Sequence, residues 1–470
     1  MLPTPVSYTV WPSVVPADKV TYMTVTPAER AYIIPDGKEY SVTVISVNSD
    51  ENYYSPKNHK KIDLAGHNGI LTFDFLFSGE GEHLIRLMSD EKEIASFTVY
   101  SLREDLYSLL PLKGDLHSHS CRSDGTRDPA AQAGHYREEG YDFVALTDHN
   151  RYFSGGEIDE AYEDVNTGLI RVFGEEVHSP GSVVHIVHVG GRESVAARYV
   201  HDRENYDAEI EEYMTKVPEN IPERYRSRYA KAMWATDAIH SVGGLAIFPH
   251  PFWRPGASRT YNVSSELAEI FLKSGMFDAY EIVGAMTQSD CNRSLALWAD
   301  LRSQGYNITV VGSSDVHSLE KSTHFPYRTT ICFAKEKTNA SIIEAVREGM
   351  CVAVESNGVE YDVQNRCYGS FRLVSYAQFL LSHYFPRLKR AAMGIGVAMR
   401  AYAMEEIDGE TVSAYSAIAD NFTERFFGRK PPVLPSQKML DFEEKWREVQ
   451  LRGPKTRGSS VDASPAKSLI

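Results

Sequence analysis

Hydrophobic and polar residues alternate one by one through the first part of the chain. Residues 40–47 are rich in β-branched side chains, and Phe73 and Phe75 flank a single polar residue. Turn-forming pairs such as the Asn-Gly at 68–69 separate these stretches. Single-residue alternation between turn signals is typical of short antiparallel strands with one buried face. We therefore expect residues 1–103 to form a small antiparallel β-sandwich without catalytic residues.

From about residue 110 the hydrophobic pattern changes its period. Short apolar runs now alternate with longer helical segments, which is typical of βα units around parallel strands. The predicted strands are 114–119, 142–149, 170–176, 183–189, 244–250, 279–283 and 308–315. Helices are predicted between them at 129–140, 225–242 and 295–304. The charged segment 194–223 is longer than a connection needs, and we expect a lid there.

The pattern changes again near residue 356. Residues 356–452 contain amphipathic helical stretches broken by prolines, which predicts a helical C-terminal region. Its small apolar residues at 391–403 are expected to form core or a homo-oligomer interface. Residues 453–470 are rich in Ser, Lys and Gly, a composition that predicts a disordered tail. These boundaries leave 111–355 as the central domain.

Composition excludes several classes of function. The 470-residue chain is long enough for two or three domains, and its net charge of −15 argues against nucleic-acid or anionic-membrane partners. A small-molecule substrate fits this charge better than a polyanion. No apolar run is long enough to cross a membrane, no leader pattern begins the chain, and the cysteines lack paired spacing. We expect a cytoplasmic protein with reduced thiols.

Metal-ligating residue types collect at the ends of the predicted strands. They are His117, His119 and Asp124, Asp148 and His149, Glu175 and Glu176, His185 and His188, His250, and Asp315 and His317. The carboxyl ends of parallel strands meet at one edge, where barrel enzymes carry their active sites. Because imidazole and carboxylate ligands suit Mn, Fe or Zn, the pattern predicts a site for divalent ions.

These motifs resemble the hallmark of the PHP (polymerase and histidinol phosphatase) family. They run in order as Asp115-Leu116-His117-Ser118-His119, Ser123-Asp124-Gly125, Thr147-Asp148-His149, Gly174-Glu175-Glu176, His250-Pro251 and Ser314-Asp315-Val316-His317. The first motifs, behind a β-sandwich, resemble the branch of carbaryl-hydrolase-like (CehA/McbA) metallohydrolases. The resemblance implies a distorted seven-stranded β/α barrel.

The resemblance also implies a cluster of two or three divalent metals. His117, His119 and Asp315 match the ligands of the first metal, and Asp124, His149 and His317 match those of the second. The third would be held by His185 and His250, with a glutamate bridging it to the first metal.

The adjacent pair Glu175 and Glu176 offers two candidates for the bridge. Spacing and strand alternation favour Glu176, since Gly174 and Glu176 share one face. His188 remains an alternative to His185. Asp115 and Asp148 are expected to orient ligands, although either could ligate.

Such a cluster predicts a hydrolase in which a metal-activated hydroxide attacks the substrate. His178, His188 or Asp148 would protonate the leaving group. The resemblance favours a phosphoesterase, with Arg122, Arg127 and above all Arg254 as phosphate contacts. A carboxyl-ester or carbamate hydrolase is the alternative, with an apolar pocket formed by Tyr152-Phe153 and Phe252-Trp253. A non-catalytic binding protein is the remote third interpretation.

Overall fold

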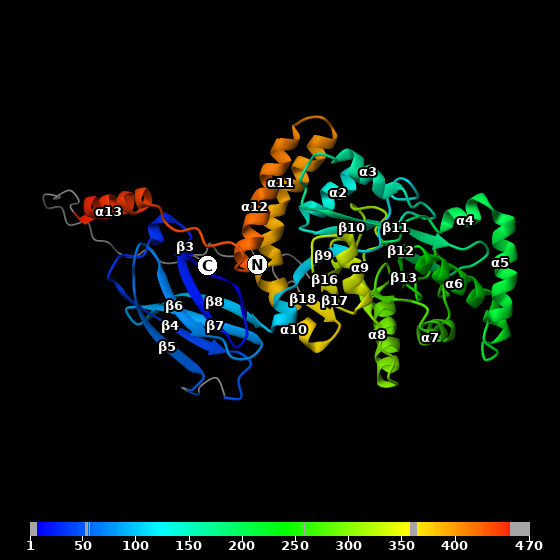
Figure 1. Cartoon of the computed structure of the whole chain (residues 1–470), viewed down its shortest axis with the longest axis horizontal. Coiled ribbons are helices and arrows are strands. Elements are labelled where there is room, and N and C mark those ends of the chain that lie inside the picture. Colours follow the sequence, from blue (N-terminus) through cyan, green and yellow to red (C-terminus); the bar gives the residue numbers. More distant parts are fainter. Residues whose placement is uncertain (1–6, 52–54, 56, 257–258, 358–363, 452–470) are drawn as a thin grey trace.

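The computed structural model describes residues 7–51, 55, 57–256, 259–357 and 364–451. Two small sheets lie at one end of the molecule and a large curled sheet with its helices lies at the other (Figure 1). Helices α11 (Phe385–Ala403) and α12 (Gly409–Phe426) stand between them. The expected tail, 453–470, is outside the described residues. Among the helices that are described, none is both long and apolar enough to span a membrane.

The N-terminal strands form two sheets that share one core. They are β1 (Tyr8–Trp11), β2 (Val14–Pro16), β3 (Val20–Pro27), β4 (Glu39–Ser46), β5 (His59–Ala65), β6 (Leu71–Leu76), β7 (Gly81–Ser89) and β8 (Lys92–Leu102). The orders are β1-β3-β6 and β2-β8-β7-β4-β5, with the short helix η1 (Arg30–Tyr32) after β3. Val25 and Phe73 from one sheet pack with Val42 and Ile85 from the other. The alternation seen in the sequence thus buries one face of each sheet.

The central strands form one ten-stranded sheet. The bounds are β9 (Leu110–Asp115), β10 (Phe143–Leu146), β11 (Ile170–His178), β12 (His185–Val189), β13 (Leu245–Phe248), β14 (Ala279–Val283), β15 (Val310–Gly312), β16 (Arg328–Ala334), β17 (Cys351–Asn357) and β18 (Gln364–Tyr368). All seven expected strands are present as β9–β15, side by side in chain order. The sheet curls, so that Thr330 Oγ1 on β16 lies 3.0 Å from the amide nitrogen of Gly312 on β15.

Two expectations about this sheet are wrong. First, β12 runs antiparallel to β11 and to β13, not parallel. The residues 179–184 between β11 and β12 are too few for a crossover helix, so the two strands form a hairpin. Second, the sheet has ten strands because β16, β17 and β18 extend it beyond β9. Strand β18 lies in the region for which only helices were expected.

Helices cover the outer face of the large sheet. They are α2 (Pro129–Glu138), α3 (Ser154–Ala161), α4 (Ala196–His201), α5 (Arg203–Lys216), α6 (Glu223–Ser241), α7 (Ser265–Ser274), α8 (Gln288–Ser303) and α9 (Asn339–Arg347), with α1 (Glu104–Tyr107) leading into β9. Helix α8 begins before the expected residue 295, because the Thr287 side chain caps its polar first turn. The segment expected to be a lid is instead packed, since Tyr199 and Tyr206 are buried against Trp234 of α6.

The C-terminal helices join the two ends of the molecule. They are α10 (Phe371–His383), α11, α12 and α13 (Gln437–Leu451). Tyr100 of β8 packs against Tyr376 and Phe379 of α10. Helix α11 packs closely on α2, and a Cβ on Gly396 would lie 2.3 Å from the carbonyl oxygen of Gly134. The small residues of α11 therefore serve a helix contact within the chain.

Candidate metal centre

The nine expected metal ligands come together at one edge of the ten-stranded sheet. Four overlapping groups of side chains could each hold an ion: His119, Asp124, His149 and His317; His117, His119, Glu176 and Asp315; His149, Glu176 and His178; Glu176, His185 and His250. Most of these residues follow the carboxyl end of a strand. His185 is the first residue of β12, and the reversal of that strand brings its beginning to the same edge.

The most deeply buried group is built from His117, His119, Glu176 and Asp315. The Nε2 atoms of the two histidines lie 3.2 Å apart. Each lies 3.4 Å from Glu176 Oε2, and their distances to Asp315 Oδ1 are 3.3 and 2.9 Å. Ligands at about 2.0–2.2 Å from a tetrahedral ion lie about 3.3–3.6 Å from one another. The spacing of these atoms is therefore close to that of a filled metal site.

Glu176 connects this group to the next one. Its Oε1 lies 2.7 Å from His185 Nδ1 and 3.4 Å from His250 Nε2, whereas its Oε2 faces His117 and His119. One carboxylate thus points its two oxygens at two neighbouring groups of imidazoles. Burial alone would raise the pKa of Glu176, but the imidazoles of the cluster hold that pKa well below its usual range.

A third group lies nearer to solvent. His149 Nε2 is 3.5 Å from Asp124 Oδ2, and His317 Nε2 is 3.3 Å from Asp124 Oδ1. The Asp124 side chain keeps 56% of its surface exposed, in contrast to 1% for Glu176. This group therefore forms the open rim of the cluster.

Several buried polar atoms of the cluster lack hydrogen-bond partners in the described part of the chain. Glu176 Oε1, Asp315 Oδ1, His149 Nδ1 and His185 Nδ1 are all buried without one. Such atoms are rare in proteins because each costs free energy to bury. Burial also lowers the pKa of His185 to about 4, so its ring is neutral at pH 7, the form that binds metals. These donors fit divalent ions of the Mn, Fe or Zn type.

The two adjacent glutamates of β11 face opposite sides of the sheet. Glu175 Oε1 accepts a hydrogen bond from the Val195 amide at 2.6 Å, and its Oε2 accepts one from Ser194 Oγ at 2.7 Å. His188 Nδ1 lies 3.2 Å from the same Glu175 carboxylate. Neither Glu175 nor His188 belongs to the groups that could hold an ion. His188, which we considered as a ligand or a proton donor, thus lies on the face away from the cluster.

The two aspartates that precede ligand histidines hold backbone and loops in place. Asp115 accepts hydrogen bonds from the amides of His117 and Ser314, each at 3.1 Å, and one from the Tyr136 hydroxyl at 2.8 Å. Asp148 accepts hydrogen bonds from Ser120 and Ser123 on the loop that carries Asp124. Both carboxylates are fully buried. Asp148, which we also considered as a proton donor, is thus occupied as a hydrogen-bond acceptor.

Glu281 on β14 is a site residue that the sequence reasoning missed. Its Oε2 lies 3.0 Å from His117 Nδ1, on the side of the ring opposite the cluster, and its side chain is fully buried. Carboxylates commonly orient metal-binding histidines in this way. The available signal was a lone glutamate inside an otherwise apolar strand, where an unpaired charge is costly.

Backbone conformation at the site is unusual at three positions. Asn150, His250 and Asp315 all have positive φ, at 54°, 24° and 48°. Such conformations cost free energy in residues other than glycine and collect at functional sites.

Asn150 Oδ1 accepts hydrogen bonds from the His178 amide at 2.9 Å and from the Tyr199 hydroxyl at 2.5 Å. Helix α4 therefore helps to fix His178, whose ring stacks on His185 with centroids 3.8 Å apart.

The three arginines that we expected to contact phosphate are paired with carboxylates. Arg122 binds Glu157 through two hydrogen bonds, and Arg127 forms an ion pair with Glu320. Arg254 lies 2.8 Å from Asp290 and stacks on Tyr261. Each of the three guanidiniums therefore has a carboxylate partner in this structure.

Of the expected apolar pocket residues, Trp253 lies beside the cluster. Its ring centroid is 5.9 Å from that of His185 and 5.8 Å from that of His250. Phe252 is buried in the core, Phe153 is 78% exposed, and Tyr152 stacks on His188 on the other face.

Neither a protein-family model nor a curated protein matches this sequence. Solved structures similar to the chain include a two-domain protein from Bacteroides vulgatus containing a predicted PHP-like metal-dependent phosphoesterase. It is 18% identical, with a TM-score of 0.35, and the match covers 56% of this chain and 76% of that one. A protein from Bifidobacterium adolescentis that is described as a candidate metal-dependent phosphoesterase is 18% identical, with a TM-score of 0.33. The match covers 45% of this chain and 91% of that one.

An amidohydrolase from Chromobacterium violaceum, solved with bound sulfate and no metal, is 19% identical. Its TM-score is 0.31, and the match covers 45% of this chain and 89% of that one. Values this low leave the assignment of a function to the geometry of the site itself.

Proposed function

We propose that this chain is a metal-dependent hydrolase of the PHP type that cleaves a small phosphoester. The observation that carries the proposal is the buried group of His117, His119, Glu176 and Asp315, whose ligand atoms are spaced as around an ion. Three further groups adjoin it, and each shares Glu176 or His119 with it. A purely structural network of this size would need hydrogen bonds for its buried atoms, and several of these atoms have none.

Some residues of the chain would bind the ions, and others would orient the residues that bind them. His117, His119, Asp315 and Glu176 would hold one divalent ion, Glu176, His185 and His250 another, and Asp124, His149 and His317 a third. Bound there, the ions would supply Lewis acidity that activates water and balances charge on the substrate. Asp115, Asp148 and Glu281 would fix the ligands before the substrate arrives, which limits rearrangement during the reaction.

His178 is the proton donor that this geometry favours among our three candidates. His188 faces the other side of the sheet, and the carboxylate of Asp148 is occupied by serine hydroxyl groups and an amide. The His178 ring lies against the cluster with Nε2 3.5 Å from Glu176 Oε1, and 28% of its side chain is exposed. The Nε2 atom itself is buried and faces the cluster, so it would pass a proton to a leaving oxygen bound there.

A phosphoester suits the site because neighbouring cation positions share one carboxylate. Both the attacking and the leaving oxygen of an in-line displacement carry charge that such positions balance. The second candidate is a carboxyl ester or carbamate. Pairing of Arg122, Arg127 and Arg254 with acids, together with Trp253 beside His185 and His250, favours this less charged substrate.

The test combines reconstitution with substrates that share one leaving group. Purified protein would be stripped, reloaded with Mn, Fe or Zn, and assayed with 4-nitrophenyl phosphate, bis(4-nitrophenyl) phosphate and 4-nitrophenyl acetate. We expect metal-dependent turnover with the highest kcat/KM for one of the two phosphates, and none for Glu176→Gln. A preference for the acetate would replace the phosphoester by the alternative. Failure to bind any of the ions would refute the hydrolase proposal itself.

A further inference from the structure

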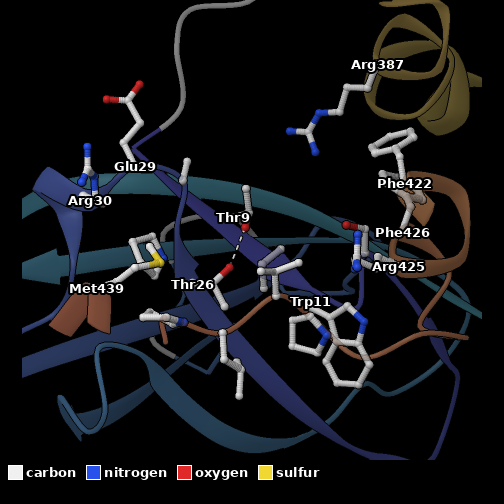
Figure 2. A pocket seen from close by; sticks show the side chains of 18 of the residues that line it. Thr9, Trp11, Thr26, Glu29, Arg30, Arg387, Phe422, Arg425, Phe426 and Met439 are labelled. Atoms are coloured by element: carbon white, nitrogen blue, oxygen red, sulfur yellow. Dashed lines mark hydrogen bonds between the residues drawn. The ribbon is translucent and has the colours of Figure 1, made fainter. Parts of the chain in front are cut away.

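A large cavity lies between the N-terminal sheets and the C-terminal helices, separate from the metal centre (Figure 2). Its volume is about 1100 Å³. Strands β1 and β3 form its floor, where the hydroxyls of Thr9 and Thr26 lie 2.8 Å apart. Phe422 and Phe426 of α12 form one wall, and the chain leading to α13 closes the other side. None of the metal-centre residues lines this cavity.

Most of the lining is apolar, but two arginines reach the same end of it. Figure 2 shows Arg387 of α11 pointing into the open space above Phe422, with Arg425 of α12 nearby. Among the described residues, no carboxylate forms an ion pair with either guanidinium, and Arg425 Nε donates to the carbonyl of Pro431 at 3.3 Å. The acidic lining residue, Glu29, lies at the opposite end. A third lining arginine, Arg30, lies beside Glu29 at that end, so the end formed by Arg387 and Arg425 is the one with cationic side chains and no acidic residue beside them, in a chain whose net charge is −15.

The contrast with Arg372 on the neighbouring helix α10 is informative. Arg372 binds the carboxylates of both Glu80 and Asp105, and these contacts raise its pKa. Arg387 has no such partner, and the walls around it together with Arg390 lower its pKa. A guanidinium that is partly withdrawn from water without a counter-charge is unfavourable, and a bound anion would offset this cost.

We propose that this cavity binds a small amphipathic anion. Its carboxylate or phosphate group would be held by Arg387 and Arg425, and its apolar body would lie along Phe422 and Phe426. The volume of about 1100 Å³ lies slightly above the usual range of about 300–1,000 Å³ for small-molecule sites, which are mainly apolar with a few placed polar groups. A second cavity of about 400 Å³ also borders Arg387 and Phe426 and offers room for a longer body.

Fluorescence of 8-anilinonaphthalene-1-sulfonate, itself an amphipathic anion, would measure binding to the full chain. Decanoate, decyl phosphate and the neutral decanamide would then compete with the dye. We expect decanoate or decyl phosphate to displace it at least about tenfold better than decanamide, because charge-assisted hydrogen bonds to arginine are strong. The stronger of the two acids would identify the anionic group. Equal displacement by all three would overturn the proposal.

Two variants of α11 give a matched comparison. Arg387→Gln should weaken dye and acid binding by roughly 10–100-fold. Arg390→Gln, three residues further along the same helix and absent from the cavity lining, should change binding less than about twofold. Equal effects of the two variants, with unchanged circular dichroism, would contradict the proposal.

Two further arms locate the bound anion. Glu176→Gln, which alters the metal centre, should leave binding unchanged; if binding is lost there, the anion sits at the metal centre and the proposal fails. If binding appears only after removal of residues 452–470, those residues and not a small anion occupy the cavity, and the proposal is overturned. Because none of these measurements uses turnover, they are independent of the proposed hydrolase.

Discussion

At the scale of single residues, two adjacent glutamates have opposite surroundings. Strand alternation sends Glu176 to the cluster and Glu175 to the amide of Val195 and the hydroxyl of Ser194. The first carboxylate faces imidazoles that could share ions with it, and the second is already satisfied by hydrogen bonds. Removing one charge should therefore have different consequences at the two positions.

We predict that Glu176→Gln loses bound metal and activity together, since an amide cannot bridge two cation positions as a carboxylate does. Metal affinity should fall by more than the roughly 10–100-fold that loss of an outer partner costs. Glu175→Gln should keep its metal but melt at a lower temperature, because its hydrogen-bond acceptors are buried. Elemental analysis and thermal melts of both variants check this. The reverse ranking would move the bridging role to Glu175.

We predict that Glu281→Gln weakens metal binding by about 10–100-fold without removing a ligand. The carboxylate lies 3.0 Å from His117 Nδ1 and orients the ring whose Nε2 faces Asp315 and Glu176. A competition titration with a chromogenic chelator measures the affinity. Glu355→Gln is the matched control, since Glu355 is an equally buried glutamate that pairs with Arg328 and belongs to none of the groups that could hold an ion. Equal metal affinity of Glu281→Gln and the unmodified protein would show that Glu281 does not orient His117.

The strand ends in the sequence indicated where the cluster would lie, and the resemblance to the PHP family selected its nine residues from a longer set of candidates. The sequence was insufficient for partners brought together by tertiary packing. Glu281 meets His117 from a strand much later in the chain, and Arg254 meets Asp290 from another connection. No local spacing predicts such pairs. The sequence therefore indicates that the arginines could contact a phosphate, but not that carboxylates distant in the chain pair with them.

At the scale of elements, the direction of β12 decides which of its histidines reaches the cluster. His185 begins the strand at the cluster edge, whereas His188 lies further along it and on the other face. The short connection from β11 indicated that β12 runs antiparallel, since a parallel crossover needs about a dozen residues or more. The βα periodicity of the surrounding segments favoured parallel strands instead and led to the wrong direction. Strand positions were therefore predicted better than strand directions.

Helix α4 supports the site through a single side chain. The Tyr199 hydroxyl donates to Asn150 Oδ1, which also accepts the His178 amide. We predict that Tyr199→Phe lowers kcat roughly fivefold, as loss of about 1 kcal/mol of positioning would do, while metal content stays unchanged. The loss should be larger for an alkyl phosphate than for 4-nitrophenyl phosphate, whose leaving group needs no proton.

The matched control for this prediction is Tyr213→Phe. Its hydroxyl donates to the carboxylate of Asp237 at 2.8 Å between α5 and α6, a more exposed tyrosine hydrogen bond away from the cluster. Tyr213→Phe should cost no more stability than Tyr199→Phe, and only Tyr199→Phe should lose activity. Equal kcat in the two variants would mean that α4 contributes packing alone.

At the scale of the whole molecule, the chain contains several separate hydrophobic cores. One core lies under α6 and α7, another unites β8 with α10–α12, and a third lies inside the large sheet. The sequence predicted the order of these parts, but not that β18 would join the large sheet or that α10 would pack on Tyr100. Contacts across such distances depend on complementary surfaces that a one-dimensional pattern does not encode.

The position of the metal ligands relative to these cores leads to the last prediction. The nine ligands lie at or near strand ends or on the loops beyond them, whereas the hydrophobic cores are built from apolar side chains of the strands and helices themselves. Stripping the ions with a chelator should therefore leave the far-UV circular dichroism nearly unchanged. It should nevertheless lower the melting temperature by a few degrees, because ions at about 100 times their Kd stabilise the folded state by about 2.7 kcal/mol. Readdition should restore the original melt, and Glu176→Gln should show a much smaller difference between the two states. If the stripped protein instead loses its secondary structure, the ligand loops hold the sheet together, and the separation of cores from the metal centre is wrong.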